Sequence, residues 1–121
     1  MELKKISGRI FYYPHQRETD RPMLVYLKGE KIMIAIDAGN SADHVDEFYK
    51  ALEVAGLKKP DFTIITHWHW DHTFGMHSVV GKTIAGQLTN KKLKEVATWQ
   101  WSDDDMKSRL ETGKDIEMCD K

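Results

Sequence analysis

The sequence predicts an α/β domain with a mixed β-sheet and helices on its outer side. Three features of the 121-residue chain lead to this prediction. Short β-branched and aromatic runs recur along the chain, a helix with one apolar face separates two of them, and a short Gly-containing connector joins another two. A short connector makes its strands antiparallel, whereas a helical crossover makes them parallel. One sheet that contains both kinds of pairing is mixed.

The composition is that of an ordinary globular domain. Hydrophobic residues make up 40% of the chain and charged residues 31%, which argues against disorder. The net charge of −1 gives no reason to expect nucleic acid or an anionic membrane as a partner. The single cysteine, Cys119, cannot form an internal disulfide, and residues 1–8 contain no apolar signal segment. We therefore expect one domain over residues 1–121, located in the cytoplasm.

The first third of the chain is predicted to be β-structure. Residues 6–13 are expected to form one strand, and the polar stretch 14–22, bracketed by prolines, a loop. Two apolar runs, 23–27 and 31–36, flank the segment Lys28-Gly29-Glu30, which is a pattern typical of a β-hairpin. The second run is almost continuously apolar, as expected for a strand covered on both faces.

Residues 41–55 have the clearest helical pattern. Asn40 or Ser41 can cap its N-terminus, and Gly56 suits the position after its C-terminus. Its apolar face consists of residues at helical spacing, namely Val45, Phe48, Tyr49 and Leu52. His44, in the first turn, is expected to be exposed and is assigned no function.

The residues that carry chemistry follow the apolar run 62–66, which the helix places parallel to the preceding strand. Three of the six histidines and one aspartate lie there within six residues: His67, His69, Asp71 and His72. In extended backbone, side chains at i and i+2 point the same way, so His67 and His69 can face one cation. A turn after the strand would let Asp71 and His72 serve a second cation. Imidazole suits zinc, iron, copper or nickel. Two such cations side by side can hold a water molecule and lower its pKa, so the segment predicts a metal site for hydrolysis.

The remaining elements are predicted to be short. Residues 75–80 are expected to form a short helix, 82–86 a strand, and 90–100 a helix with lysines opposite its apolar side. Residues 102–110 are expected to form another helix, whose acidic first turn we prefer over a cation site. The two tryptophans that alternate with the metal-binding residues are expected to pack in the core.

The segment from Thr66 to Gly75, with the pattern His-x-His-x-Asp-His, resembles the signature of the metallo-β-lactamase superfamily. The upstream run from Ile34 to Gly39 resembles the second landmark of that family, an apolar strand ending in Asp-x-Gly. The resemblance implies the N-terminal half of an αββα sandwich. The family completes its site with histidines and an acidic residue on later strands, whereas no histidine follows His77 in this chain. We therefore interpret the chain as truncated.

The resemblance also implies roles for individual residues. His67 and His69 would bind a first metal, and Asp71 and His72 a second. Asp71 would also act in catalysis by orienting the attacking water, and Asp37 would support the ligands from behind. The implied function is that of a hydrolase, in which water bridging two zinc ions attacks an ester, thioester, amide or phosphoester of a small-molecule substrate.

Two alternatives stay open. An oxidoreductase on the same fold would use iron, with manganese as another possible metal. The flavodiiron branch typically has glutamate at the position of His69, which counts against that branch. A non-catalytic fragment is the second alternative, because two protein ligands per metal fall short of the three that catalytic zinc usually takes. We expect weak metal binding and little activity from this chain alone, unless another chain or a second copy supplies the rest. His15 and Arg17 are interpreted as solvated loop residues rather than substrate contacts.

Overall fold

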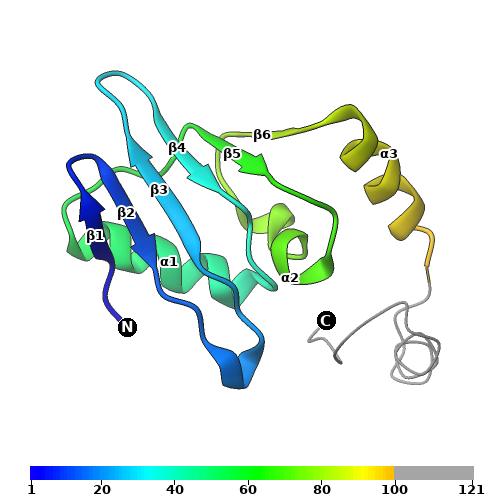
Figure 1. Cartoon of the computed structure of the whole chain (residues 1–121), viewed down its shortest axis with the longest axis horizontal. Coiled ribbons are helices and arrows are strands. Elements are labelled where there is room, and N and C mark those ends of the chain that lie inside the picture. The colour runs from blue at the N-terminus through cyan, green and yellow to red at the C-terminus, as the bar shows by residue number, and fades with distance from the viewer. Residues whose placement is uncertain (100–121) are drawn as a thin grey trace.

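The computed structural model describes residues 1–99. Its elements are, in chain order, β1 (Lys4–Ser7), β2 (Ile10–Tyr13), η1 (Arg17–Thr19), β3 (Leu24–Lys28), β4 (Met33–Ile36), α1 (Ala42–Val54), β5 (Phe62–Ile65), α2 (Trp70–Thr73), η2 (Met76–Ser78), β6 (Lys82–Ala85) and α3 (Gln87–Val96). The six strands of this part form one sheet in the order β1 to β6, so each strand lies beside its neighbour in sequence (Figure 1). β1 to β4 are antiparallel, and β4, β5 and β6 are parallel. The predicted mixed α/β architecture is confirmed.

The chain begins with a hairpin, so the single strand predicted for residues 6–13 was wrong. β1 and β2 pair antiparallel, and the chain reverses between them at Gly8, whose φ is +44°. Glycine reaches this left-handed backbone at little steric cost, so Gly8 and Arg9 form the turn between β1 and β2.

The central part of the sheet agrees with the prediction. β3 and β4 form the expected hairpin around Gly29, whose N–H donates to the carbonyl of Ile32 at 3.0 Å. α1 then crosses to β5, which pairs parallel with β4. Ser41 is the N-cap of α1, because its Oγ accepts the backbone N–H of His44 at 3.3 Å.

α1 packs on one face of the sheet, and the core lies between them. The core cluster comprises Tyr13, Leu24, Tyr26 and Ala35 from the strands and Val45, Phe48, Tyr49, Ala51 and Leu52 from α1. The apolar helix face predicted from sequence is therefore the buried one. Because side chains alternate along a strand, the opposite face of the sheet carries a second apolar set that is partly covered or exposed, namely Ile10, Val25, Leu27, Ile34, Ile36, Phe62, Ile64 and Ile84.

His44 is fully buried, so the expectation of an exposed residue was wrong. The physical reason is helical spacing, since His44 lies four residues before Phe48 and eight before Leu52, on the face that α1 turns to the sheet. Its ring lies 6.3 Å from the ring of Tyr13, measured between centroids.

The segments after β5 follow the predicted order. η2 lies within the short helix predicted at 75–80, and β6 matches the predicted strand at 82–86. α3 begins at Gln87, ahead of the predicted start at residue 90. The predicted helix 102–110 and Cys119 lie outside the described residues. Within the part described, no helix has the length and hydrophobicity needed to cross a bilayer.

Candidate metal centre

The candidate site lies where β4 and β5 end. Asp37 directly follows β4, and Thr66 and His67 directly follow β5. Because the two strands are parallel, their carboxyl ends meet at the same edge of the sheet, where α/β sheets commonly bind ligands. The backbone joins the two ends, since the N–H of Asp37 donates to the carbonyl of Ile64 at 2.8 Å.

The four residues predicted as metal ligands lie together at this edge. The ring centroids of His67 and His69 are 4.8 Å apart, and those of His67 and His72 are 4.1 Å apart. Nε2 of His72 lies 3.4 Å from a carboxylate oxygen of Asp71. The turn that brings Asp71 and His72 back toward the strand end is the single helical turn α2.

The carboxylate of Asp37 is buried at the centre of a hydrogen-bond network. Its Oδ1 accepts the backbone N–H of Thr66 at 2.8 Å, and the Thr66 hydroxyl lies 2.9 Å from both carboxylate oxygens. Its Oδ2 lies 2.7 Å from Nδ1 of His72. Asp37, His67 and His72 each have a potential ligand atom within 4.8 Å of the others. Both oxygens of Asp37 are already engaged, which suits a residue that holds the histidines in place.

The same network sets the tautomers of two histidines. The Thr66 hydroxyl donates to Asp37, so its oxygen is left to accept Nδ1–H of His67 at 2.8 Å. Asp37 accepts Nδ1–H of His72 in the same way. We assign both tautomers from these partners. Nε2 of each ring then carries a free lone pair, as a metal-binding histidine requires. The sequence analysis gave Thr66 no role, although its position directly before His67 could have drawn attention to its hydroxyl.

The electrostatics keep Asp37 ionised. Burial alone would raise the pKa of its carboxyl, but the hydrogen bonds from His72 and Thr66 outweigh burial and lower that pKa below its ordinary value. For His72, burial acts to lower the pKa, while the hydrogen bond and charge of Asp37 and the charge of Asp71 raise it overall. Burial and the neighbouring His72 and His69 lower the pKa of His67, which favours the neutral, metal-binding ring.

Asp71 also lines a cavity of about 240 Å³ beside the cluster. The other walls come from the loop between β2 and β3, including the exposed side chains of His15 and Arg17. This loop is fastened to α1, because Arg21 forms an ion pair with Glu47. A small molecule in this cavity would contact both the loop and the predicted metal-binding segment.

The two tryptophans of the segment differ in their surroundings. Trp70 is buried, as expected. Trp68 is only half-buried, so the expectation of core packing was wrong for this residue. Its ring meets that of Trp99 edge to face at 5.8 Å between centroids, and Nζ of Lys92 lies 5.0 Å above it. The ring of Trp68 therefore packs against Lys92 of α3 and against Trp99, which lies beyond the end of that helix.

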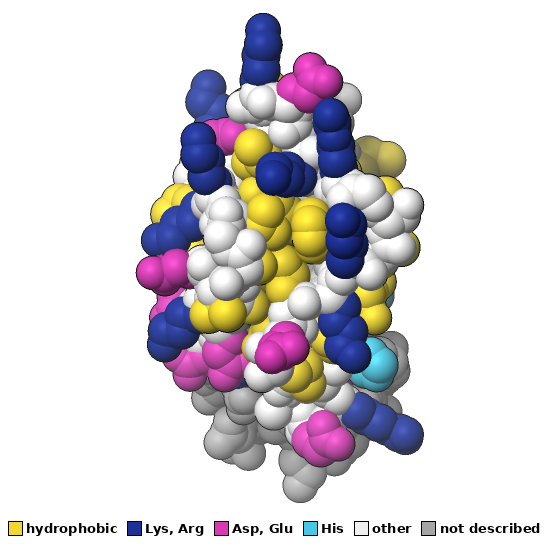
Figure 2. All heavy atoms as spheres, turned by 90° about the vertical axis from the view of Figure 1, so that its left-hand side faces the viewer, with side chains coloured by type: hydrophobic (Ala, Val, Ile, Leu, Met, Phe, Trp, Pro, Cys, Tyr) yellow, Lys and Arg dark blue, Asp and Glu magenta, His cyan; other side chains and the backbone are white. Residues whose placement is uncertain are grey.

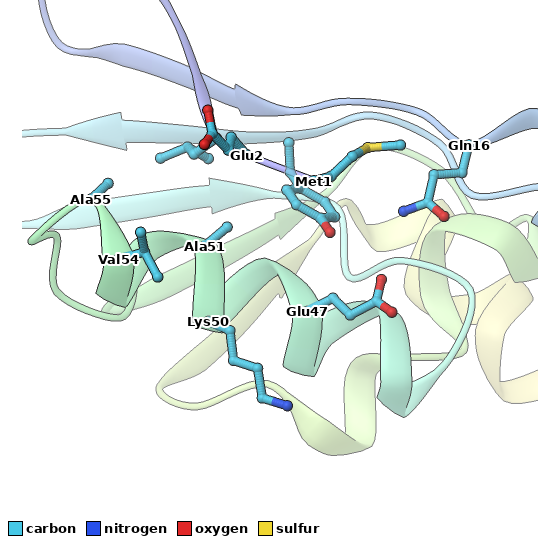
Figure 3. Close-up of a pocket in the computed structure, with 10 residues that line it drawn as sticks. Met1, Glu2, Gln16, Glu47, Lys50, Ala51, Val54 and Ala55 are labelled. Atoms are coloured by element: carbon cyan, nitrogen blue, oxygen red, sulfur yellow. The ribbon is translucent and has the colours of Figure 1, made fainter.

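A larger pocket, of about 770 Å³, lies away from this site (Figure 3). It is lined by Met1, Glu2, Leu3, Tyr13, Gln16, Glu47, Lys50, Ala51, Val54 and Ala55. On the side of the molecule that carries β1 and the C-terminal end of α1, Figure 2 shows hydrophobic side chains in a band between Lys and Arg side chains. None of the predicted metal ligands lines this pocket, so it is separate from the candidate metal centre.

Together, the fold and the histidine cluster define an α/β domain with a candidate metal centre at the carboxyl ends of its parallel strands. The family model of the metallo-beta-lactamase superfamily matches residues 21–116. The chain belongs to this superfamily. No curated protein matches the chain.

Solved structures with a similar fold include metallo-beta-lactamases. The enzyme from Pontibacter korlensis is 21% identical with a TM-score of 0.67, and the match covers 79% of this chain and 48% of that one. The enzyme from Hirschia baltica is 20% identical with a TM-score of 0.64, again covering 79% and 48%. FIM-1 from Pseudomonas aeruginosa, solved in a mono-zinc form, is 14% identical with a TM-score of 0.61, covering 78% and 46%. The chain thus spans less than half the length of each of these relatives.

Proposed function

We propose that this chain carries the metal-binding segment of a metal-dependent hydrolase, with zinc as the metal. His67 and His69 would hold a first ion, and Asp71 and His72 a second. Two such ions would lower the pKa of a water molecule held between them, which would supply the nucleophile for attack on an ester, thioester, amide or phosphoester. The membership in the superfamily supports the class of reaction, and the loop cavity beside Asp71 supports a small-molecule substrate.

One observation carries the proposal. Asp37 and Thr66 engage Nδ1 of His72 and Nδ1 of His67, which in the assigned tautomers leaves Nε2 of each ring to bind a metal, and the two ring centroids lie 4.1 Å apart. Removing a residue that orients a metal-binding histidine in this way typically costs about 10- to 100-fold in metal affinity or activity. Histidines on an unspecialised surface loop have no need of a buried carboxylate behind them.

The chain's own residues would do three things. His67 provides a neutral nitrogen donor, since burial lowers the pKa of its ring. Asp71 lies at the wall of the loop cavity, where its carboxylate can accept a proton from a water molecule that faces a bound substrate. The ionised carboxylate of Asp37 bonds Nδ1 of His72 and would compensate the positive charge of a metal ion bound by that ring.

The test is zinc-dependent hydrolysis by the purified chain. One chromogenic substrate of each class, a p-nitrophenyl ester, an aryl thioester, an anilide and bis-p-nitrophenyl phosphate, would be assayed with and without added zinc. The comparison is with a His67→Ala/His69→Ala double variant. His77→Ala is the matched control, because His77 is an exposed histidine outside the cluster.

The proposal expects at least one class to be hydrolysed slowly in a zinc-dependent manner, with the rate lost in the double variant and retained in the control. Equal rates in the chain and the double variant would contradict it. So would zinc that binds to the cluster without accelerating hydrolysis of any class.

A further inference from the structure

The turn that carries Asp37 is joined to the first turn of α1 by a buried histidine. Nδ1 of His44 accepts the backbone N–H of Asn40 at 3.3 Å, and the backbone N–H of His44 donates to Oγ of Ser41. The side chains of His44 and Asn40 are both almost completely buried, so the Asn40 N–H has little access to water. A buried N–H that loses its acceptor is left with an uncompensated desolvation cost.

This arrangement is a variant of the capping box. In the usual motif, the third helical residue is Glu or Gln, and its side chain returns to the backbone N–H of the N-cap. Here His44 is the third helical residue, and its ring returns one residue further, to Asn40, which precedes the N-cap Ser41. The bond therefore reaches beyond the helix into the turn that begins at Asp37.

That turn needs external support. Asp37 has a φ of +69°, a left-handed conformation that non-glycine residues rarely adopt. Such strain persists where surrounding contacts determine the backbone. On the side of α2, the N–H of Ala38 donates to the carbonyl of His72 at 3.0 Å, and the N–H of Gly75 donates to the carbonyl of Gly39 at 3.2 Å. On the side of α1, His44 supplies the contact.

His44 lies directly against the turn. A Cβ atom placed on Gly39 would lie 2.5 Å from Nδ1 of His44, closer than real side chains approach. The side-chain nitrogen of Asn40 also donates to the carbonyl of Thr19 at 2.8 Å, so the same residue connects the turn to the β2–β3 loop. The ring of His44 thus packs where the Asp37 turn, the helix and the loop come together.

We propose that His44 is a positioning residue for the metal centre: its Nδ1 fixes the Asn40 amide, and with it the turn that aims the Asp37 carboxylate at Thr66 and His72. This inference rests on the proposed function, because the residues it positions are those that orient the metal-binding histidines. His44 itself does not contact the metal ligands through any hydrogen bond found among residues 1–99.

The opposing interpretation is that His44 only fills space in the core. The two interpretations can be distinguished because, of the two ring nitrogens, Nδ1 accepts a hydrogen bond. Nε2 has no hydrogen-bond partner within residues 1–99. Asparagine places its side-chain oxygen near the position of Nδ1, glutamine places its polar atoms near Nε2, and leucine has no acceptor. A positioning role requires the acceptor at Nδ1, whereas a space-filling role favours leucine.

The experiment compares the full chain with His44→Asn, His44→Gln and His44→Leu. Amide hydrogen exchange of the metal-free proteins would follow the Thr66 N–H, which donates to Asp37, with the Tyr26 amide in the central strand β3 as reference for global opening. Zinc dissociation constants of the same proteins would be measured by calorimetric titration, and urea unfolding would establish that each variant is folded.

We expect exchange at Thr66 to accelerate about tenfold relative to Tyr26 in His44→Leu and His44→Gln, and zinc binding to weaken about tenfold. His44→Asn would retain both properties within about threefold. Unchanged relative protection of Thr66 in His44→Leu would overturn the inference, as would equal effects of asparagine and leucine. If the parent chain binds no zinc while exchange at Thr66 still responds, the proposed function fails and the positioning of Asp37 stands.

Discussion

Nδ1 of His72 donates a 2.7 Å hydrogen bond to the carboxylate of Asp37, which lies 35 residues earlier in the sequence. Asp37 directly follows β4 and His72 lies within the helical turn α2, so β4 and α2 must both be formed before the pair can exist. The pair therefore connects folding of the sheet to orientation of the metal-binding ring.

Replacing Asp37 by Asn should weaken zinc binding about 10- to 100-fold, the usual effect of removing a carboxylate behind a metal-binding histidine. The amide keeps the shape but loses the negative charge that raises the pKa of His72. Calorimetric zinc titration at neutral pH measures the effect. Asp43→Asn is the matched control, because Asp43 is an exposed aspartate in the first turn of α1 and should leave zinc affinity unchanged.

Thr66→Val should lower zinc affinity about tenfold, because the methyl group cannot accept Nδ1–H of His67 or donate to Asp37. Thr66→Ser keeps the hydroxyl and should bind zinc within about threefold of the parent chain. The same zinc titration provides the comparison. A serine variant that loses as much zinc affinity as the valine variant would contradict a role specific to the hydroxyl.

Gly75→Ala should destabilise the chain by about 1–3 kcal/mol, in the range of overpacked interiors. A Cβ there would lie 2.0 Å from the carbonyl oxygen of Ala38, so the Asp37 turn would have to move. Gly86→Ala is the matched control, since its Cβ would meet nothing closer than 4.0 Å. Gly86 is the N-cap of α3, where alanine is less favourable than glycine, so this variant should lose no more than about 1 kcal/mol. Urea unfolding measures both variants, and equal stability of the two would contradict the predicted contact.

Much of the fold could be predicted from sequence because it depends on local patterns. Helical spacing identified the buried face of α1, and Gly29 marked the β3–β4 hairpin. The hairpin at Gly8 was missed because β1 contains one apolar residue, Ile6, and only Gly8 and Arg9 separate it from β2. The position of His44 could have been predicted from its spacing to Phe48, had a histidine been counted with the apolar face.

The candidate site could be predicted only in part. The cluster from His67 to His72 is close in sequence, so a single segment identifies it. The hydrogen bonds that join Asp37 to Thr66 and His72 connect residues 29 and 35 positions apart, and they depend on the parallel pairing of β4 with β5. The left-handed backbone of Asp37 is likewise determined by tertiary contacts rather than by local preference.

Acidification should selectively destabilise the parent chain through His44. Burial, with the charges of Arg21 and His72, lowers the pKa of His44 from 6.5 to about 4. A lowered pKa contributes stability that is present above pH 6.5 and is lost as pH falls toward 4, because the unfolded chain takes up the proton first. Each unit of pKa difference corresponds to about 1.4 kcal/mol, so up to about 3 kcal/mol depends on this ring.

Urea unfolding of the metal-free parent chain and of His44→Asn between pH 7.5 and about 4 isolates this contribution. The stability of the parent relative to the variant should decrease as the pH falls. His77→Asn, which replaces an exposed histidine, should follow the parent at every pH. Parallel curves for the parent and His44→Asn would contradict a buried, neutral His44.

The most direct test of the account is the zinc content of the purified chain after equilibration with excess zinc and removal of unbound metal, measured by elemental mass spectrometry. The same measurement on the His67→Ala/His69→Ala variant identifies the site. The account predicts bound zinc in the parent chain that is lost in the variant. Equal zinc in both proteins, or none in the parent chain at any zinc concentration that keeps it folded, would contradict the claim that this histidine cluster is a metal centre.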